Sequence, residues 1–512
     1  MNKQLNMAGL EAWMRANIDG FRGPVRIEQF SGGQSNPTFR VSSADQEFVL
    51  RSRPTGELLR SAARLPRPYT VPLPIPPVAR PVRSTATTDF YQLAAREADV
   101  EILPGLRTRI FGYDGRFPGP TLVSRSGRST VVTHRNDLPV PVAVHLHGGH
   151  TPADSDGYPT DLVAPAGRRD YTYPMRQRAA TLWYHDHRMD FTGPQVNRGL
   201  AGFHLVTDDE QDALGLPTGD RDIPLMITDR AFDEEGSLRY PAQHHGAGVT
   251  DAYMEGVLGD VILVNGAPWP VLEVAAARYR LRLLNASNAR RYRLSLDPPR
   301  TPLVQVASDG GLLERSIEHA AVVLAAGERC EVVVDFAAFP AGAQVTMRNS
   351  LGTGTTRDVM RFQVTHRGAD DSRVPPQLSR LELLRRETAV RTRTWSFRRA
   401  PTGEHPGWLL DGRAFDPTRI DADVRLGEVE IWRFNSDLHH SVHVHLDPFQ
   451  VLERRGADPG PYDGGWKDTV DISPSESVDV AVRFTDYPGR YLLHCHNLEH
   501  EDMAMMAAFR TS

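Results

Sequence analysis

The sequence predicts an all-β protein of three β-sandwich blocks, preceded by a short α+β N-terminal appendage. Its 512 residues exceed what one ordinary core accommodates and suggest roughly three domains. Short β-rich runs such as YQLAAREADVEI, VAVHLH and RYRLRLLNAS recur from about Asp89 onward, separated by Pro and Gly, which favours antiparallel sandwiches. Helical apolar periodicity is scarce after residue 65, apart from short stretches such as Asp209 to Leu214.

Residues 1–65 stand apart from this β-rich pattern. LEAWMRANI predicts an amphipathic helix, and IEQFSGGQSNPTFRVSSADQEFVLRSRPTGELL predicts a hairpin. The segment resembles the start of aminoglycoside-phosphotransferase-like kinases, in which GGQSNPTF would cover the nucleotide phosphates. No catalytic-loop Asp with a metal-binding Asn follows, and Arg51 stands near the expected position of a nucleotide-binding Lys. We therefore expect a fusion remnant or a start-site artefact whose deletion leaves the chemistry of the later residues intact.

Proline- and arginine-rich segments mark the expected domain boundaries. LPRPYTVPLPIPPVARPVR has a polyproline character that is typical of a strap or linker. THRGADDSRVPP separates the middle block from the last, and a weaker break lies near residues 208–222. The predicted organisation is an appendage over 1–65, a linker over 66–84, and sandwich domains over 85–210, 211–368 and 369–512.

Composition and charge exclude several classes of partner. Charged residues make up 24% of the chain and the formal net charge is −5, so we expect neither nucleic acid nor another macromolecule as partner; the oligomeric state stays open. The two cysteines, Cys330 and Cys495, do not suggest a disulfide framework. Neither a membrane span nor a secretory or twin-arginine leader is recognisable, so we expect a cytoplasmic or otherwise soluble protein without an export signal.

Four His-x-His pairs are the strongest chemical signal in the chain. Random placement of 19 histidines would give roughly 0.7 such pairs, so four require a mechanism. Residues i and i+2 of a strand point to the same face, so each pair presents two imidazoles side by side. A single pair is readily explained as a structural feature, but four pairs in apolar strands indicate a shared metal cluster. The pairs are His145/His147, His185/His187, His443/His445 and His494/His496.

The last pair encloses Cys495, which lies on the opposite face of its strand. His440, His500 and Met505 complete a set of one thiolate, two imidazoles and one thioether. This set is typical of a blue-copper electron-transfer site with Met505 as the weak axial ligand. The alternatives are a structural thiol or a zinc ligand, but zinc rarely recruits Met and would not explain eight further histidines. The backbone of Cys495 also joins one metal site covalently to His494 and His496 of the other.

These residues resemble the four copper signatures of the multicopper oxidase family, in their usual order. The motifs are HLHGG, WYHDH, HSVHVH and HCHNLEHEDMAMM, and the resemblance covers roughly residues 70–512. It is greatest with bacterial laccases of the spore-coat type and phenoxazinone synthase, through PGLRTRIFGYDGRFPGPT, HLHGGHTPADSDGYP, GLAGFHLV and GWKDTV. The resemblance implies three cupredoxin-like Greek-key sandwiches and four coppers per chain, namely one type 1, one type 2 and a type 3 pair.

The resemblance also implies a role for each ligand position. His145 and His443 would hold the type 2 copper. The type 3 pair would be held by His147, His185, His187, His445, His494 and His496. The trinuclear cluster would then lie between the first and last domains, so that folding and metal loading are coupled. The middle block contains no candidate ligand and would space the outer domains and help to wall the substrate pocket.

Two acidic residues match positions that supply protons in similar laccases. They are Asp156, in ADSDGYP, and Glu501, directly after His500. Solvated loop carboxylates are the alternative for both. His150 and His439 adjoin ligand positions but are out of register, so we interpret them as bystanders or as groups that contact ligands. Cys330 is most simply a small packing residue, and Trp408 and Trp466 either border the substrate pocket or pack in a core.

The expected function is laccase-like oxidation of phenols and aromatic amines, coupled to four-electron reduction of dioxygen to water. The small aromatic reductant would be oxidised at an exposed edge of the type 1 copper near His500. Two alternatives remain. A metallo-oxidase for cuprous or similar ions would need a methionine-rich segment, whereas only Met503, Met505 and Met506 cluster here. A copper-free structural protein would lack ligands, whereas every ligand position is filled.

Overall fold

The computed structural model describes residues 10–11, 14–15, 21–29, 38–43, 46–51, 58–240, 255–402 and 405–512. The chain divides into two compact units, Met1–Gly56 and Glu57–Ser512. In the first unit residues 10–11 and 14–15 are helical, and the strands β1 (Arg26–Gln29), β2 (Thr38–Ser43) and β3 (Gln46–Arg51) form one antiparallel sheet in that order. The expected hairpin thus has a third strand, because the segment before GGQSNPTF pairs with β2. Most of GGQSNPTF lies outside the described residues.

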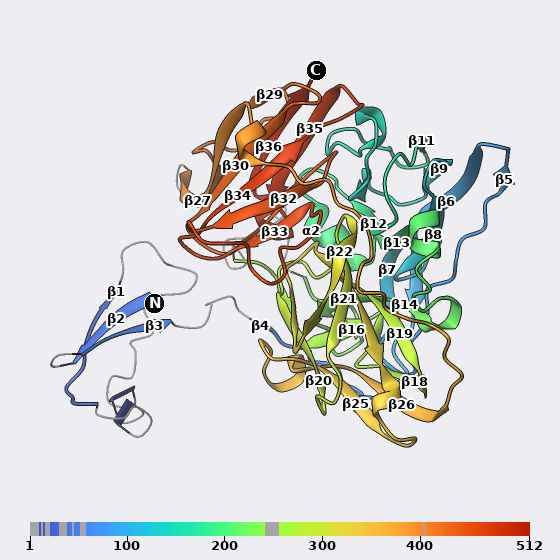
Figure 1. The fold of residues 1–512 in the computed structure, drawn as a ribbon, viewed down its shortest axis with the longest axis horizontal. Coiled ribbons are helices and arrows are strands. Elements are labelled where there is room, and N and C mark those ends of the chain that lie inside the picture. Colours follow the sequence, from blue (N-terminus) through green and yellow to red (C-terminus); the bar gives the residue numbers. More distant parts are fainter. Residues whose placement is uncertain are drawn as a thin grey trace. The chain divides into compact units, whose positions relative to one another are not determined.

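The second unit contains three consecutive pairs of sheets, which we call the first, middle and last sandwiches (Figure 1). The first sandwich has one sheet in the order β10-β12-β13-β8 and another in the order β11-β9-β6-β5, with β7 paired to β6. Its elements are β5 (Arg83–Ser84), β6 (Thr88–Val100), β7 (Thr108–Tyr113), β8 (Gly119–Arg125), β9 (Ser129–Asn136), β10 (Val144–His147), a 3-10 turn (Ala153–Ser155), β11 (Arg168–Tyr173), β12 (Ala180–Asp186), α2 (Thr192–Arg198) and β13 (Ala201–Thr207).

The middle sandwich is the largest of the three. Its sheets run β17-β16-β14-β19-β24-β21-β22 and β18-β26-β25-β20-β23. After the short helix α3 (Asp209–Asp212) and 3-10 turn Gly219–Arg221, its elements are β14 (Asp222–Arg230), β15 (Leu258–Gly259), β16 (Val261–Val264), β17 (Ala267–Pro268), β18 (Val271–Ala276), β19 (Arg278–Asn285), β20 (Tyr292–Asp297), β21 (Leu303–Ser308), β22 (Gly311–His319), β23 (Val322–Leu324), β24 (Arg329–Asp335), β25 (Gln344–Asn349) and β26 (Asp358–Arg367), with 3-10 turns at Phe336–Ala338 and Gly354–Thr356.

The last sandwich has sheets in the orders β28-β27-β30-β34-β32 and β29-β36-β35-β31-β33. Its elements are a 3-10 turn (Arg386–Thr388), β27 (Arg391–Thr402), β28 (His405–Leu410), β29 (Ala422–Val424), β30 (Val429–Ser436), β31 (His440–Val444), β32 (Phe449–Arg454), β33 (Thr469–Ile472), β34 (Ser477–Arg483), β35 (Gly489–Cys495), α4 (Leu498–Asp502) and β36 (Met506–Thr511).

The sheets are mixed rather than purely antiparallel. Parallel pairs occur in every sandwich, for example β8 with β13, β14 with β19 and β27 with β30. A parallel pair requires a connection that leaves the sheet and returns, which Greek-key crossovers between two packed sheets provide. Short β-runs and turns identify a sandwich, but they do not reveal these crossovers.

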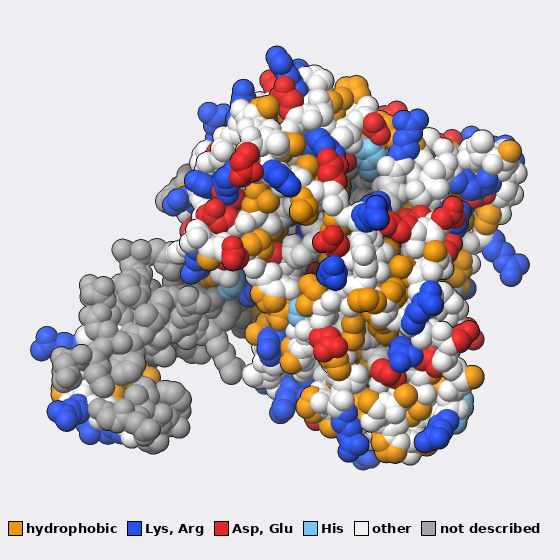
Figure 2. All heavy atoms as spheres, in the orientation of Figure 1, with side chains coloured by type: hydrophobic (Ala, Val, Ile, Leu, Met, Phe, Trp, Pro, Cys, Tyr) orange, Lys and Arg blue, Asp and Glu red, His pale blue; other side chains and the backbone are white. Residues whose placement is uncertain are grey.

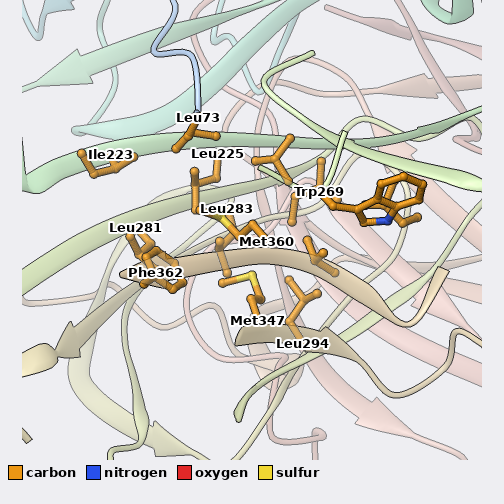
Figure 3. Close-up of a cluster of buried hydrophobic side chains, with 14 of the residues drawn as sticks. Leu73, Ile223, Leu225, Trp269, Leu281, Leu283, Leu294, Met347, Met360 and Phe362 are labelled. Atoms are coloured by element: carbon orange, nitrogen blue, oxygen red, sulfur yellow. The ribbon is translucent and has the colours of Figure 1, made fainter. Parts of the chain in front are cut away.

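The proline-rich segment packs against the sandwiches instead of spanning open solvent. Leu73 is buried in the core of the middle sandwich with Leu225, Leu283 and Phe362 (Figure 3). The residues just before it also belong to the second unit, because β4 (Leu58–Leu59) pairs with β15 and Ser61 hydrogen-bonds Asp260. The expected appendage ended at residue 65, whereas the first compact unit ends at Gly56. The domain boundaries within 85–512 remain predictions.

The surface offers no single field of charge on the face drawn in Figure 2, where basic and acidic side chains are interspersed. Among the described residues, no helix is sufficiently long and apolar to cross a membrane. Both cysteines are free and buried, and Cys330 belongs to the hydrophobic core of the middle sandwich.

Candidate metal centres

One buried group of ligand atoms lies entirely within the last sandwich. His440 begins β31, Cys495 ends the neighbouring β35, and His500 lies in α4 directly after it. The Cys495 sulfur lies 3.4 Å from His440 Nδ1 and 3.5 Å from His500 Nδ1, and the two nitrogens are 3.2 Å apart. Three soft or borderline ligand atoms thus converge on one point, as a trigonal thiolate–imidazole metal site requires.

The surroundings of Cys495 fit a bound cation. Burial raises the pKa of the thiol to about 12, so the thiolate needs a positive partner at neutral pH. Met505 is fully buried in the same hydrophobic cluster, and its backbone is tied to the site by Cys495 N to Met505 O and Met505 N to His500 O hydrogen bonds of 3.1 and 3.0 Å. The structure therefore brings the four expected residues of this site into one pocket of the core.

Trp408 covers the imidazole that the sequence suggested would be exposed. Its ring stacks on His500 with centroids 3.8 Å apart and planes 28° apart. His500 is only 2% exposed, and Trp408 is itself buried. The expected exposed edge at His500 is therefore absent among the described residues, since this ring is buried and stacks on Trp408 from β28. Trp408 both packs in the core and borders the site.

The second group of ligand atoms is shared between the first and last sandwiches. The first sandwich contributes His145 and His147 from β10 and His185 and His187 from the end of β12, where His145 and His185 are paired across the two strands. The last sandwich contributes four histidines from the ends of β31 and β35, where His443 is paired with His494. The strand register therefore gathers each set of four. The last-sandwich residues are His443, His445, His494 and His496.

The two sets of histidines meet at short distances. His145 Nε2 lies 3.4 Å from His443 Nε2, and His187 Nε2 lies 3.3 Å from His494 Nε2, so both contacts cross between sandwiches. His494 Nε2 also lies 3.1 Å from His445 Nε2. Two groups of three histidines each lie close enough to hold one ion. One consists of His147, His185 and His496, and the other of His187, His445 and His494. The remaining two, His145 and His443, lie next to each other at a third position between the sandwiches.

Unpartnered buried nitrogens show that these residues fit metal ions. Within the described residues, His147 Nδ1, His185 Nε2 and both ring nitrogens of His496 have no hydrogen-bond partner, although all are buried. Burial lowers the pKa of His185 to about 3 and that of His187 to about 4, so these rings are neutral and present lone pairs. Orphaned buried acceptors are costly, and coordination to a cation removes that cost.

Hydrogen bonds on the outer ring nitrogens orient most of the ligands. His145 Nδ1 and His443 Nδ1 donate to the backbone oxygens of Asp156 and Asp468 over 2.6 and 2.8 Å, and His185 Nδ1 donates to Asp186 O over 2.8 Å. These bonds leave Nε2 as the free nitrogen of each ring. His147 has the opposite arrangement, because its Nε2 lies 3.1 Å from Asp468 Oδ1 and its Nδ1 is the buried nitrogen without a hydrogen-bond partner.

The two expected acidic residues contact ligand imidazoles and are buried. Asp156 Oδ2 accepts a 2.7 Å hydrogen bond from His445 Nδ1. Glu501 Oε2 lies 3.2 Å from His494 Nδ1, and its Oε1 lies 3.4 Å from His187 Nδ1. Neither is the solvated loop carboxylate that was the alternative, because both side chains are about 1% exposed.

A cleft of about 360 Å³ reaches two of the histidines, His145 and His445. His150, which the sequence analysis treated as a bystander or a ligand contact, lies in its wall. Its Nδ1 is 2.9 Å from Asp447 and its Nε2 is 3.2 Å from Asp486. Trp466 also lines this cleft, so it borders the group of eight histidines rather than the thiolate site.

His439, the other histidine that the sequence analysis placed out of register, does not line the cleft. Its Nε2 lies 3.4 Å from a guanidinium nitrogen of Arg291.

Sequence reasoning missed two residues that contact these sites, Asp468 and Arg329. Asp468 lay in a noted segment and Trp408 was expected to border the pocket or pack in a core, but nothing in their spacing indicated which ring they would touch. Arg329 begins β24 in the middle sandwich and forms two hydrogen bonds to Asp468, of 2.7 and 2.5 Å. Long-range partners of this kind carry no local sequence signal.

The three sandwiches, the buried thiolate–imidazole site and the eight clustered histidines define a copper-dependent oxidoreductase of cupredoxin-like architecture. Two family models, both described as multicopper oxidase, match residues 94–211 and 360–512. The chain is 36% identical over 502 residues to a laccase of Bacillus stratosphericus, covering 85% of this chain and 97% of that one. It is 37% identical over 500 residues to a bilirubin oxidase of Albifimbria verrucaria, covering 90% and 84%.

A solved structure supports the same conclusion. The crystal structure of a multi-copper oxidase from Pediococcus acidilactici superposes with a TM-score of 0.80 and 31% identity, over 88% of this chain and 93% of that one. The chain belongs to the multicopper oxidase family. The resemblance, the fold class and the expectation of four coppers, one type 1, one type 2 and a type 3 pair, are thereby confirmed.

Proposed function

We propose that this multicopper oxidase is laccase-like, coupling one-electron oxidation of phenols or aromatic amines to four-electron reduction of dioxygen to water. The observation that carries the proposal is the position of Cys495 between His494 and His496. The thiolate faces one metal site while its two neighbours face the other, so one stretch of backbone connects both. Copper supplies the one-electron chemistry at the first site and dioxygen reduction at the second.

The assignment of each ligand follows from the groupings. Cys495, His440 and His500 would hold the type 1 copper, with Met505 as the weak axial ligand. His145 and His443 would hold the type 2 copper. The type 3 pair would be held by two triads that each mix the first and last sandwiches, His147, His185 and His496 on one ion and His187, His445 and His494 on the other.

Asp156 and Glu501 are assigned to proton supply. Reducing one dioxygen to two waters consumes four protons as well as four electrons. Both carboxylates are buried; Asp156 accepts a hydrogen bond from His445, and a Glu501 oxygen lies 3.2 Å from His494 Nδ1, so they lie where those protons are needed. Through the same contacts they orient His445 and His494.

Aromatic donors suit the thiolate site better than metal ions do. The metallo-oxidase alternative would need several accessible thioethers, whereas Met505 and Met506 are buried in the core and only Met503 of the three is partly exposed. The Trp408 ring instead stacks on His500 and is buried with it, so the site is enclosed by aromatic and apolar side chains rather than by free thioethers. Electron transfer through these side chains requires proximity and a suitable potential, but no bond to copper.

Oxygen uptake tests this function. The copper-loaded protein is mixed with 2,6-dimethoxyphenol, an aminophenol, bilirubin or cuprous ion, while oxygen consumption and hydrogen peroxide are recorded. The proposal predicts turnover of the phenol and the aminophenol, four donor molecules oxidised to radicals per dioxygen, and no peroxide. Turnover of cuprous ion or bilirubin alone, or release of one peroxide per dioxygen, would contradict it.

A further inference from the structure

We propose that Arg329, from the middle sandwich, is a positioning residue for the trinuclear copper centre. It acts through Asp468, which determines the ring nitrogens that His147 and His443 turn toward copper. The inference rests on the proposed function, because it concerns the same centre. It also gives the middle sandwich a part in the chemistry, although among the described residues this sandwich supplies none of the clustered ligand atoms.

Asp468 contacts two ligands in opposite ways. Its side-chain Oδ1 lies 3.1 Å from His147 Nε2, so His147 donates there and keeps Nδ1 for the cluster. Its backbone oxygen accepts a 2.8 Å hydrogen bond from His443 Nδ1, so His443 keeps Nε2. The hydroxyl of the next residue, Thr469, lies within 3.2 Å of both rings. One short segment therefore selects the tautomer of a ligand from each outer sandwich.

Arg329 holds that segment in place from the other side. Its two terminal nitrogens form a fork on the Asp468 carboxylate, at 2.7 and 2.5 Å, and both side chains are buried. Its Nε donates to Thr181 O at 3.0 Å, in the first sandwich, and Nη2 donates to Asp309 O at 3.2 Å. One guanidinium thus joins all three sandwiches around Asp468. A planar fork fixes the direction of a carboxylate, which a lysine ammonium would not.

The backbone next to Arg329 is built for this close approach. A Cβ at Gly327 would lie 3.0 Å from His496 Cγ and 3.2 Å from His147 Cε1. A Cβ at Gly148, directly after His147, would lie 2.5 Å from Arg329 Nη2. Both glycines have positive φ angles, of 87° and 83°, which disfavour other residues. The middle-sandwich loop therefore lies against the ligand rings themselves.

A second buried cation, Lys467, pairs with acidic side chains next to Arg329. Lys467 Nζ lies 3.1 Å from both Asp309 Oδ2 and Glu328 Oε1. Asp309 in turn accepts a 2.7 Å hydrogen bond from the Arg329 backbone nitrogen. Because these charges are buried and paired, Arg329 has little freedom to leave Asp468.

The test compares Arg329→Lys with Arg282→Lys, both loaded with copper as full-length protein. Arg282 is a matched control in the same sandwich: it is equally buried and forms a fork of 2.7 Å bonds to Asp222, while also meeting Glu331 at 2.9 Å. Copper per chain, the blue type 1 absorption, the EPR signal of the type 2 copper, kcat and KM for the phenol are measured.

For R329K we expect an altered or weakened type 2 signal and a kcat about 10- to 100-fold lower, as for other partners of metal ligands. The type 1 absorption and KM for the phenol should stay unchanged. R282K should retain the type 2 signal and kcat of the unmodified protein. If R329K has the type 2 signal and kcat of R282K, the proposal is overturned.

A second variant keeps the test decisive if R329K does not fold. Arg329→Leu combined with Asp468→Asn removes both charges together, so no buried charge is left unpaired. It should fold and show the same changes in type 2 signal and kcat, and normal values for both would overturn the proposal. Failure of the proposed function would look different, because the unmodified protein itself would then lack the blue absorption and the oxygen uptake.

Discussion

The two metal centres of this protein differ in how much of the chain must come together to build them. The thiolate site draws His440, Cys495 and His500 from two neighbouring strands and one short helix of a single sandwich. The histidine cluster needs four strand ends from two sandwiches, and its outer hydrogen bonds reach a third through Arg329. The first site should therefore form when the last sandwich folds, whereas the second should form only when the sandwiches dock.

Replacing Cys495 with Ser should give the largest effect and separate the centres most cleanly. The variant loses the thiolate, so the blue absorption should vanish and turnover of the phenol should fall by at least about 1000-fold. The three coppers of the other centre should remain, because no histidine is removed. Copper analysis and absorption spectra check this outcome.

Cys330→Ser is the matched control for that substitution. Cys330 is the other free and buried cysteine, and it packs in the middle sandwich. The control should stay blue and active. A colourless Cys330→Ser protein, or a blue Cys495→Ser protein, would mean that the thiolate site lies elsewhere.

Replacing Asp156 with Asn should affect the shared centre alone. Its carboxylate accepts from His445 Nδ1 and is buried, so the amide loses the proton-carrying group while its shape is kept. We expect kcat to fall about 10- to 100-fold with the type 1 absorption unchanged. Glu501→Gln should behave in the same direction. Single-turnover reduction of the type 1 copper by the phenol should keep its normal rate. If that step is slowed, Asp156 acts in oxidation of the donor rather than in reduction of dioxygen, which would contradict its assignment.

These expectations also separate what the sequence could reveal from what it could not. The ligands were predictable because i and i+2 residues share a strand face, so HLH, HDH, HVH and HCH carry their own geometry. The reversed ring of His147 was not predictable, because it depends on Asp468, more than 300 residues away in the chain. Trp408 over His500 and Arg329 beside Asp468 belong to the same category of tertiary contact, for which no spacing rule exists.

A histidine in the wall of the cleft, His150, should give a smaller effect that depends on pH. Burial lowers the pKa of His150, but Asp447 and Asp486 raise it more, so the net pKa is raised. A raised folded-state pKa adds stability that is complete below the unfolded value of about 6.5 and is lost as pH rises past the folded value. His150→Gln should therefore lower Tm more at pH 5.5 than at pH 9, by a margin on the order of 2 °C.

His319→Gln is the control for this pH dependence. His319 bonds Gln305 at 2.9 Å, and burial lowers its pKa, so its loss should not be more harmful in acid. A His150 variant whose Tm deficit is constant or grows with rising pH would show that the two aspartates do not stabilise the charged imidazole.

Deleting residues 1–56 should have the smallest effect on either centre. Neither group of ligands includes a residue of this first compact unit, and the chain after Glu57 forms its own unit. Copper content and kcat should stay within about twofold of the full chain. Deleting residues 1–65 should instead lower Tm, because Leu59 and Ala63 are buried in the second unit and Ser61 bonds Asp260. Equal Tm values for the two deletions would contradict this boundary.

The central claim is that one chain holds a single thiolate copper and a separate trinuclear centre. Total copper by mass spectrometry, set against EPR-detectable copper by spin integration, tests it most directly in the oxidised protein. The account predicts four coppers per chain, of which two are EPR-detectable, because the type 3 pair is coupled and silent. One copper per chain, or four that are all detectable, would contradict it.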